Sequence, residues 1–149
     1  MFDEVITFFE GKTKGQRMAR RSDFTPTELQ KYLPNIVLVE LKYNDVDKVV
    51  DIYCQVCGSK CAALYGEVTG TWLSTFESQD VFIRIKNRCQ LVADKCQEIA
   101  ITTQVLSKDK EHIVLRALYV PLSEDNKRVN KILAFIENDT FLNAQNVPY

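Results

Sequence analysis

The order of hydrophobic patterns along the chain constrains its fold more than any other feature of the sequence. Two segments rich in β-branched and aromatic residues come first, one long amphipathic segment follows, and three more β-rich segments come last. Strands are therefore expected at residues 35–43, 49–57, 98–107, 113–122 and 129–137. Polar and charged turn residues separate the strands within each group, so these strands are expected to pair as antiparallel neighbours.

The long amphipathic segment, residues 79–95, is expected to be a helix between the two groups of strands. Its apolar residues recur at alternating steps of three and four positions and form one stripe: Phe82, Ile85, Cys89, Val92 and Cys96. An order of this kind closes as a single sheet whose first strand lies beside its last. The sequence thus predicts an α+β domain, with a five-stranded antiparallel sheet, helices on one face and an N-terminal helical extension.

A short apolar stripe lies at the start of the chain. Phe2, Val5, Ile6 and Phe9 recur at the spacing of one helix face, and a helix this short is not stable alone in water. We therefore expect it to dock, either on the chain's own sheet or on a second copy. Two glycines within residues 11–15 are expected to break the helix and make a flexible linker. This gives an extension at residues 1–24 and a domain at residues 25–149.

A basic segment without acidic residues follows this helix. Arg17, Arg20 and Arg21 are candidate contacts for an anion such as phosphate or an acidic partner, and a solvated linker is the alternative. The whole chain has 19 Lys and Arg against 20 Asp and Glu, a net charge of −1. A protein that binds polyanions in general would be strongly basic, so nucleic acid is not an expected partner.

The first residues of the chain and its cysteines indicate where in the cell the protein is expected. Asp3 and Glu4 stand where a signal peptide would be basic, and no signal peptide is expected. The apolar run at residues 36–39 is far shorter than the ~20 residues of a membrane span, so no membrane partner is expected. The five cysteines are odd in number and lie within expected regular elements, which indicates reduced thiols and a cytoplasmic protein.

Three of these cysteines, Cys54, Cys57 and Cys61, are close enough in sequence to raise the question of a metal site. On a regular strand, residues three apart point to opposite faces, so Cys54 and Cys57 are not expected to converge and no metal is predicted. The single histidine, His112, follows a charged turn and is expected to be solvated. No nucleophile–base motif is present, so an enzyme is not the expected function. A small cysteine-dependent enzyme or thiol/redox sensor stays open as the alternative.

Several short motifs occur in a defined order. They are Arg21-Ser22-Asp23-Phe24-x-Pro26, Leu33-Pro34, Gly58-Ser59, Gly66-Glu67-Val68-Thr69-Gly70 and Pro121-Leu122-Ser123. Over about residues 17–137 the chain resembles a family of small bacterial PAS-like proteins, many of them stand-alone. It departs from that family at Gln55, where an arginine is common, and at Glu67, where aspartate is usual.

The resemblance implies a sensory domain with a small-molecule pocket between the sheet and its helices. The candidate pocket residues are Cys54, Tyr65, Trp72, Phe76, Phe82, Ile85 and Arg116. Simple core packing is the alternative for the aromatic members. The segment Asn87-Arg88-Cys89-Gln90 does not reproduce the flavin motif of PAS domains, and the long helix has no histidine for haem. No cofactor is predicted, and the ligand class is left open.

The expected function is that of a non-enzymatic sensory or regulatory module that senses a small ligand or relays a signal through protein–protein contact. PAS-like domains often dimerise through an N-terminal helix on the exposed sheet face. The resemblance therefore favours a homodimer formed by Phe2, Val5, Ile6 and Phe9, together with a signalling protein as a further partner.

Overall fold

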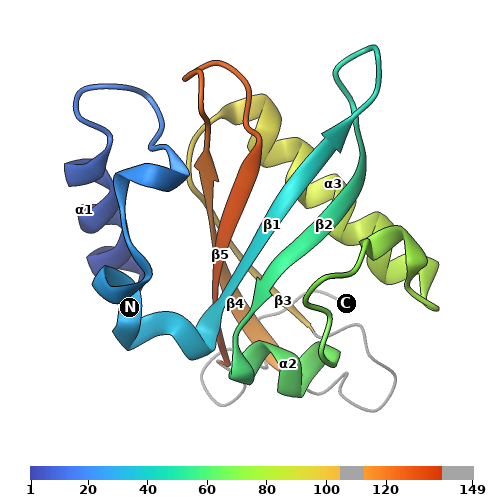
Figure 1. The fold of residues 1–149 in the computed structure, drawn as a ribbon. Coiled ribbons are helices and arrows are strands. Elements are labelled where there is room, and N and C mark those ends of the chain that lie inside the picture. Colours follow the sequence, from blue (N-terminus) through green and yellow to red (C-terminus); the bar gives the residue numbers. More distant parts are fainter. Residues whose placement is uncertain (105–112, 139–149) are drawn as a thin grey trace.

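The computed structural model describes residues 1–104 and 113–138, and these residues form one five-stranded antiparallel sheet with helices on both faces (Figure 1). The strands are β1 (Ile36–Tyr43), β2 (Val49–Cys57), β3 (Ile99–Gln104), β4 (Val114–Leu122) and β5 (Lys131–Asn138). Their order across the sheet is β2-β1-β5-β4-β3. The predicted strand order, with the first strand beside the last, is confirmed. The expected hairpin turn at residues 108–111 lies outside the described residues.

The helices are of two kinds, α-helices and 3₁₀ helices. They are α1 (Phe2–Lys12), η1 (Arg21–Asp23), η2 (Pro26–Asn35), α2 (Ser59–Tyr65), η3 (Leu73–Thr75) and α3 (Gln79–Lys95), of which the three η helices are 3₁₀. The bounds of α3 are the predicted ones. The Ser78 side chain accepts a hydrogen bond from the Val81 N–H at its start, and Cys96 adopts a left-handed conformation at its end, with φ of 53°.

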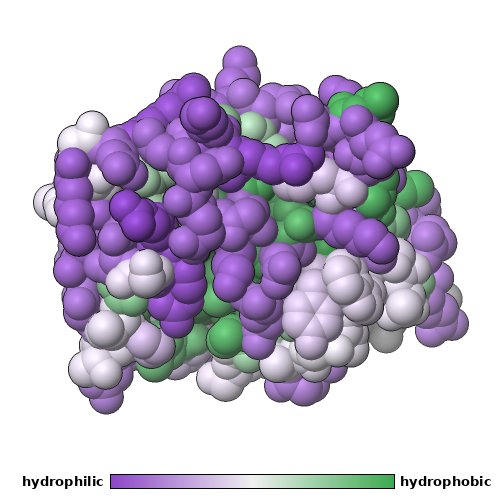
Figure 2. Space-filling view, turned by 45° about the horizontal axis from the view of Figure 1, so that its top comes forward, coloured by the Kyte–Doolittle hydropathy of each residue, from purple (hydrophilic) through white to green (hydrophobic). Residues whose placement is uncertain are grey.

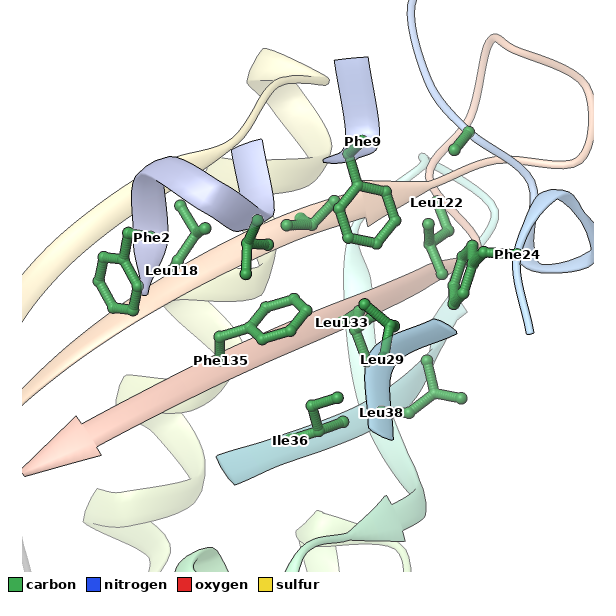
Figure 3. Packing of buried hydrophobic residues seen from close by; sticks show 13 residues of the cluster. Phe2, Phe9, Phe24, Leu29, Ile36, Leu38, Leu118, Leu122, Leu133 and Phe135 are labelled. Carbon is green, nitrogen blue, oxygen red and sulfur yellow. The ribbon is translucent and has the colours of Figure 1, made fainter. Parts of the chain in front are cut away.

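The two faces of the sheet carry separate hydrophobic cores because successive side chains of a strand point to opposite faces. Leu118, Leu133 and Phe135 belong to the core under α1 and η2, which we call the outer core (Figure 3). Ile52, Val92 and Ile132 belong to the core under η3 and α3, which we call the inner core. Strands β4 and β5 are therefore covered on both sides.

Helix α1 docks on the sheet of its own chain. Phe2, Val5 and Phe9 are at most 6% exposed, and the half-buried Ile6 packs against the same core. The expectation that this stripe covers a second copy is thus not what the structure shows, since the stripe is already buried in cis. Whether two copies associate stays a prediction.

The segment after α1 is held at several points. The helix continues through Gly11 to Lys12, so the predicted break at Gly11 is wrong. The Met18 N–H donates to Asn126 Oδ1 at 3.0 Å, and the Ser123 N–H donates to the Ala19 carbonyl at 3.0 Å. These contacts tie residues 18 and 19 to the end of β4. The extension and the domain therefore share one core, and whether the domain folds without the extension stays a prediction.

Strand β2 contains two irregularities that change which side chains face inward. In its pairing with β1, Val50 and Gln55 are extra residues without a partner, which is the geometry of a β-bulge. Regular alternation along the strand would place Val50, Ile52, Cys54 and Val56 on one inward face, but this expectation is wrong at both ends, because Val50 and Val56 are 38% and 43% exposed. The bulge at Gln55 instead turns Cys57 to the same face as Cys54. The expectation that these two cysteines point apart is therefore also wrong.

Large hydrophobic side chains that remain exposed belong to several separate segments. Val46 in the β1–β2 turn is the most exposed of them in the described residues, at 70%, and Ile83 and Leu91 lie on the outward side of α3. The view in Figure 2 shows a largely hydrophilic surface with smaller hydrophobic areas between the polar side chains. None of the described helices is long and apolar enough to cross a membrane.

Candidate ligand-binding site

A cavity of about 80 Å³ lies between the inner face of the sheet and α3. Side chains from β1, β2, β4, β5, α2 and α3 line it, and nearly all of them are apolar. Its polar groups are the hydroxyls of Tyr65 and Tyr119, three thiols and one guanidinium, that of Arg88. An apolar pocket with a few polar groups is the usual form of a small-molecule site.

Four of the seven predicted pocket residues line this cavity: Cys54, Tyr65, Phe76 and Ile85. Cys54 comes from the inward face of β2, and Tyr65 is the last residue of α2. Phe76 follows η3, and Ile85 lies in α3 one turn before Cys89. These four predicted residues, which come from separate parts of the chain, thus lie around one cavity.

Trp72 and Phe82 lie elsewhere. The segment that contains Trp72 runs along the free edge of β2, where the Cys54 N–H donates to the Thr71 carbonyl at 3.0 Å. The Trp72 ring lies 5.1 Å from that of Tyr53 and is 40% exposed, outside the cavity. Phe82 is buried in the inner core but does not reach the cavity wall. For Phe82, core packing is therefore the role that the structure shows.

Arg116 lies on the opposite face of the sheet from the cavity. Its guanidinium is 4.8 Å from the centre of the Phe2 ring, and its Nη1 is 3.0 Å from Glu137 Oε1. The alternation of β4 places it beside Leu118, on the face that α1 covers. The prediction that Arg116 is the polar anchor of the pocket is therefore wrong.

Arg88 is the charged residue that the sequence analysis missed. It lies on α3 three residues after Ile85, at the flank of the apolar stripe, and its Nη2 donates to Thr103 Oγ1 at 2.9 Å. The Tyr119 hydroxyl interacts with the same guanidinium. The spacing of three residues from Ile85 is the only sequence signal for its position, and Arg84 and Lys86 lie as close to Ile85 in the sequence.

Burial sets the protonation states of the cavity. It raises the pKa of both Tyr65 and Tyr119, so both hydroxyls keep their protons at neutral pH. Burial also raises the pKa of the Cys54 thiol to about 11 and that of the Cys89 thiol to about 12. Since the thiolate is the nucleophile, neutral thiols of this kind are poor catalysts.

The bulge in β2 brings three cysteines to one region. Cys54 and Cys57 face the same side, and each also raises the pKa of the Cys61 thiol, in addition to the larger effect of burial. Among the described residues all five cysteines are free, and no group of three or more His, Cys, Asp or Glu side chains is arranged to hold a metal ion. The absence of a metal stays a prediction.

The basic segment after α1 makes mainly intramolecular contacts. Arg17 Nη2 donates to the Lys95 carbonyl at 2.9 Å, which caps the C-terminal end of α3. Arg21 Nη1 donates to the Phe24 carbonyl at 3.1 Å. The Arg20 backbone N–H donates to the Asp23 carboxylate at 2.8 Å. The guanidiniums of Arg17 and Arg21 thus have structural partners, and an anion contact by these arginines stays a prediction.

The chain was compared with models of protein families and with curated proteins. A family model described as "PAS domain" matches residues 2–137, from the first residue of α1 to the penultimate residue of β5. The match therefore includes α1, the whole sheet and every element that lines the cavity. A search of curated proteins found no match.

Proposed function

The chain belongs to the PAS domain family, and from this premise we propose that it is a non-enzymatic sensory or regulatory module that binds a small, largely apolar molecule between its sheet and α3. The observation that carries the proposal is the cavity itself, with an apolar wall and a cluster of polar groups around Arg88. A PAS domain with such a cavity has the features expected of a sensor.

The size of the cavity limits its occupant. Its volume of about 80 Å³ is roughly half that of the ~150 Å³ apolar cavity that takes up benzene. A flavin or a haem is many times larger than benzene and would require the inner core to separate. The cavity therefore supports a small organic ligand rather than one of these cofactors.

The raised thiol pKa values support a role in binding rather than in catalysis, because they keep the cysteines of the cavity neutral. Free cysteines also support a reducing, cytoplasmic location. A thiol sensor is the second candidate function, and the clustering of Cys54, Cys57 and Cys61 by the β2 bulge is the observation that favours it. Rapid reaction of these thiols with a mild oxidant at pH 7 would favour this second function.

A signal from the cavity would leave the domain through contact with a signalling protein or a second copy. A homodimer remains part of the proposal. Because the stripe of α1 is buried in cis, the contact between copies would use another surface or an exchange of α1 between them.

The test is whether the cavity takes up a small molecule. Freshly purified protein is examined by native mass spectrometry, and its melting temperature is measured with and without n-butanol, a small neutral probe. We expect a bound molecule or a higher melting temperature. Ala134→Leu, which adds three carbons at the cavity wall, should abolish the effect, whereas Ala63→Leu adds the same atoms at an exposed position of α2 and should not. Equal uptake by both variants would refute the site.

A further inference from the structure

We propose that the ligand of this cavity is a short-chain monocarboxylate, whose carboxylate is held by Arg88 and whose hydrocarbon chain fills the apolar part. This inference rests on the proposed function, because it names the chemical class of the molecule that the cavity binds.

Arg88 makes no ion pair with another of the described residues. The half-buried guanidinium has five N–H donors, of which Thr103 Oγ1 accepts one at 2.9 Å, and the Tyr119 hydroxyl also interacts with it. None of the ion pairs within residues 1–104 and 113–138 includes Arg88. By contrast, Arg116, also half-buried, pairs with Glu137 at 3.0 Å. A charge held against an apolar wall is costly without a partner, and a bound anion would supply one.

The groups around Arg88 also suit a carboxylate. The hydroxyls of Tyr65 and Tyr119 share the cavity wall with it, and both keep their protons at neutral pH because burial raises their pKa. A protonated hydroxyl can donate a hydrogen bond to an anion, as a guanidinium does in pairs with carboxylates. No Asp or Glu is among the described residues that line the cavity, although the charge of Glu67 outside the wall contributes to the raised pKa of Cys54 and Cys57.

The volume sets the length of the apolar part. The remaining wall is formed by aliphatic and aromatic side chains such as Val39, Ile85 and Phe76. Benzene has six carbons, so about half the volume of a cavity that holds it corresponds to an apolar chain of about three carbons, as in butyrate. A dicarboxylate would place its second charge against this wall without a partner. Butyrate and isobutyrate are therefore the matched probes, and a single acid group is the expected chemistry.

The experiment compares butyrate with butyramide, which has nearly the same shape but no charge. Binding to the full-length protein is measured by isothermal titration calorimetry. We expect butyrate to bind at least tenfold more tightly than butyramide. Arg88→Met, which removes the charge but keeps much of the length, should abolish this preference. Arg84→Met removes a cation from an exposed position of the same helix, one turn away, and should leave the preference unchanged.

Each other outcome counts against the inference in a distinct way. If n-butanol and butyramide bind as tightly as butyrate, the cavity is a ligand site but its ligand is not a carboxylate. If none of the three probes binds, the proposed function fails as well. If Arg88→Met does not fold, the side-chain N–H signal of Arg88 in the unmodified protein replaces the variant. That signal must shift with butyrate and stay in place with butyramide, and the reverse result would overturn the assignment.

Discussion

Phe9 provides a test of where α1 packs. Its side chain is 3% exposed, and its ring meets those of Phe24 and Phe135 edge to face, with centroids 5.2 Å and 6.3 Å apart. Replacing a buried Phe by Ala lowers the free energy of unfolding by about 3–5 kcal/mol, partly through the cavity that is left. A domain of this kind has about 5–15 kcal/mol in total. Phe9→Ala is therefore expected to remove a large share of the stability of the whole domain.

The assay is urea unfolding followed by circular dichroism, at two protein concentrations about a hundredfold apart. For packing in cis, the loss caused by Phe9→Ala is the same at both concentrations, because no association is involved. Phe8→Ala is the matched control, since it removes the same atoms from a half-buried neighbour and should cost less. If stability rises with concentration in the unmodified protein, and Phe9→Ala abolishes only that rise, the helix docks on a second copy and our reasoning is refuted.

Three further predictions follow from single positions. Gly58→Ala should destabilise the fold, because a Cβ there would lie 2.6 Å from the Pro34 carbonyl oxygen. Gly11→Ala should instead stabilise it by about 0.5–1 kcal/mol, because this position in α1 has open space for a Cβ. Equal melting temperatures for the two variants would contradict this prediction. Hydrogen bonds from the backbone of residues 127 and 128 lower the pKa of Asp125 to about 2, so its contribution to stability is present above pH ~4 and is lost as the pH falls towards 2. Asp125→Ala should therefore be less stable than the unmodified protein at pH 7, and the difference should disappear in acid unfolding near pH 2. Burial raises the pKa of Cys89 to about 12, so ionisation of this thiol should destabilise the fold as the pH rises from about 8.5 towards 12, and Cys89→Ala should lack that part of the alkaline loss.

The sequence predicted those elements of the fold in which hydrophobic residues recur at a regular spacing. Helix α3 has an apolar stripe over its full length and a serine cap, and its bounds were predicted to the residue. The strand order was also predictable, because one hairpin and a meander of three strands leave few ways to close an antiparallel sheet. The bulges in β2 were not, because Val50 and Val56 are as apolar as the residues that they were grouped with. One extra residue reverses the alternation, and composition gives no sign of it.

The candidate site was only partly predictable for a related reason. Cys54, Tyr65, Phe76 and Ile85 were found because apolar residues near the long helix belong to the inner core. Arg116 was expected in the cavity, but the arginine that lines it is Arg88. Alternation identifies the residues of a strand that share a face, but it does not say which face has the cavity. On a strand buried on both sides, such as β4, a charged residue fits either face by pattern alone.

Helix α1 makes the two faces of the sheet different, because it covers the outer face of β4 and β5. On the outer face, Arg116 pairs with Glu137 of β5, and α1 adds an aromatic partner, Phe2, from its first turn. Arg116 therefore has its partners on that face. The inner face has the apolar cavity and a guanidinium, that of Arg88, that no described carboxylate pairs with. A docked N-terminal helix thus leaves the inner side of the sheet as the place where a small anion would complete the packing and the charge balance together.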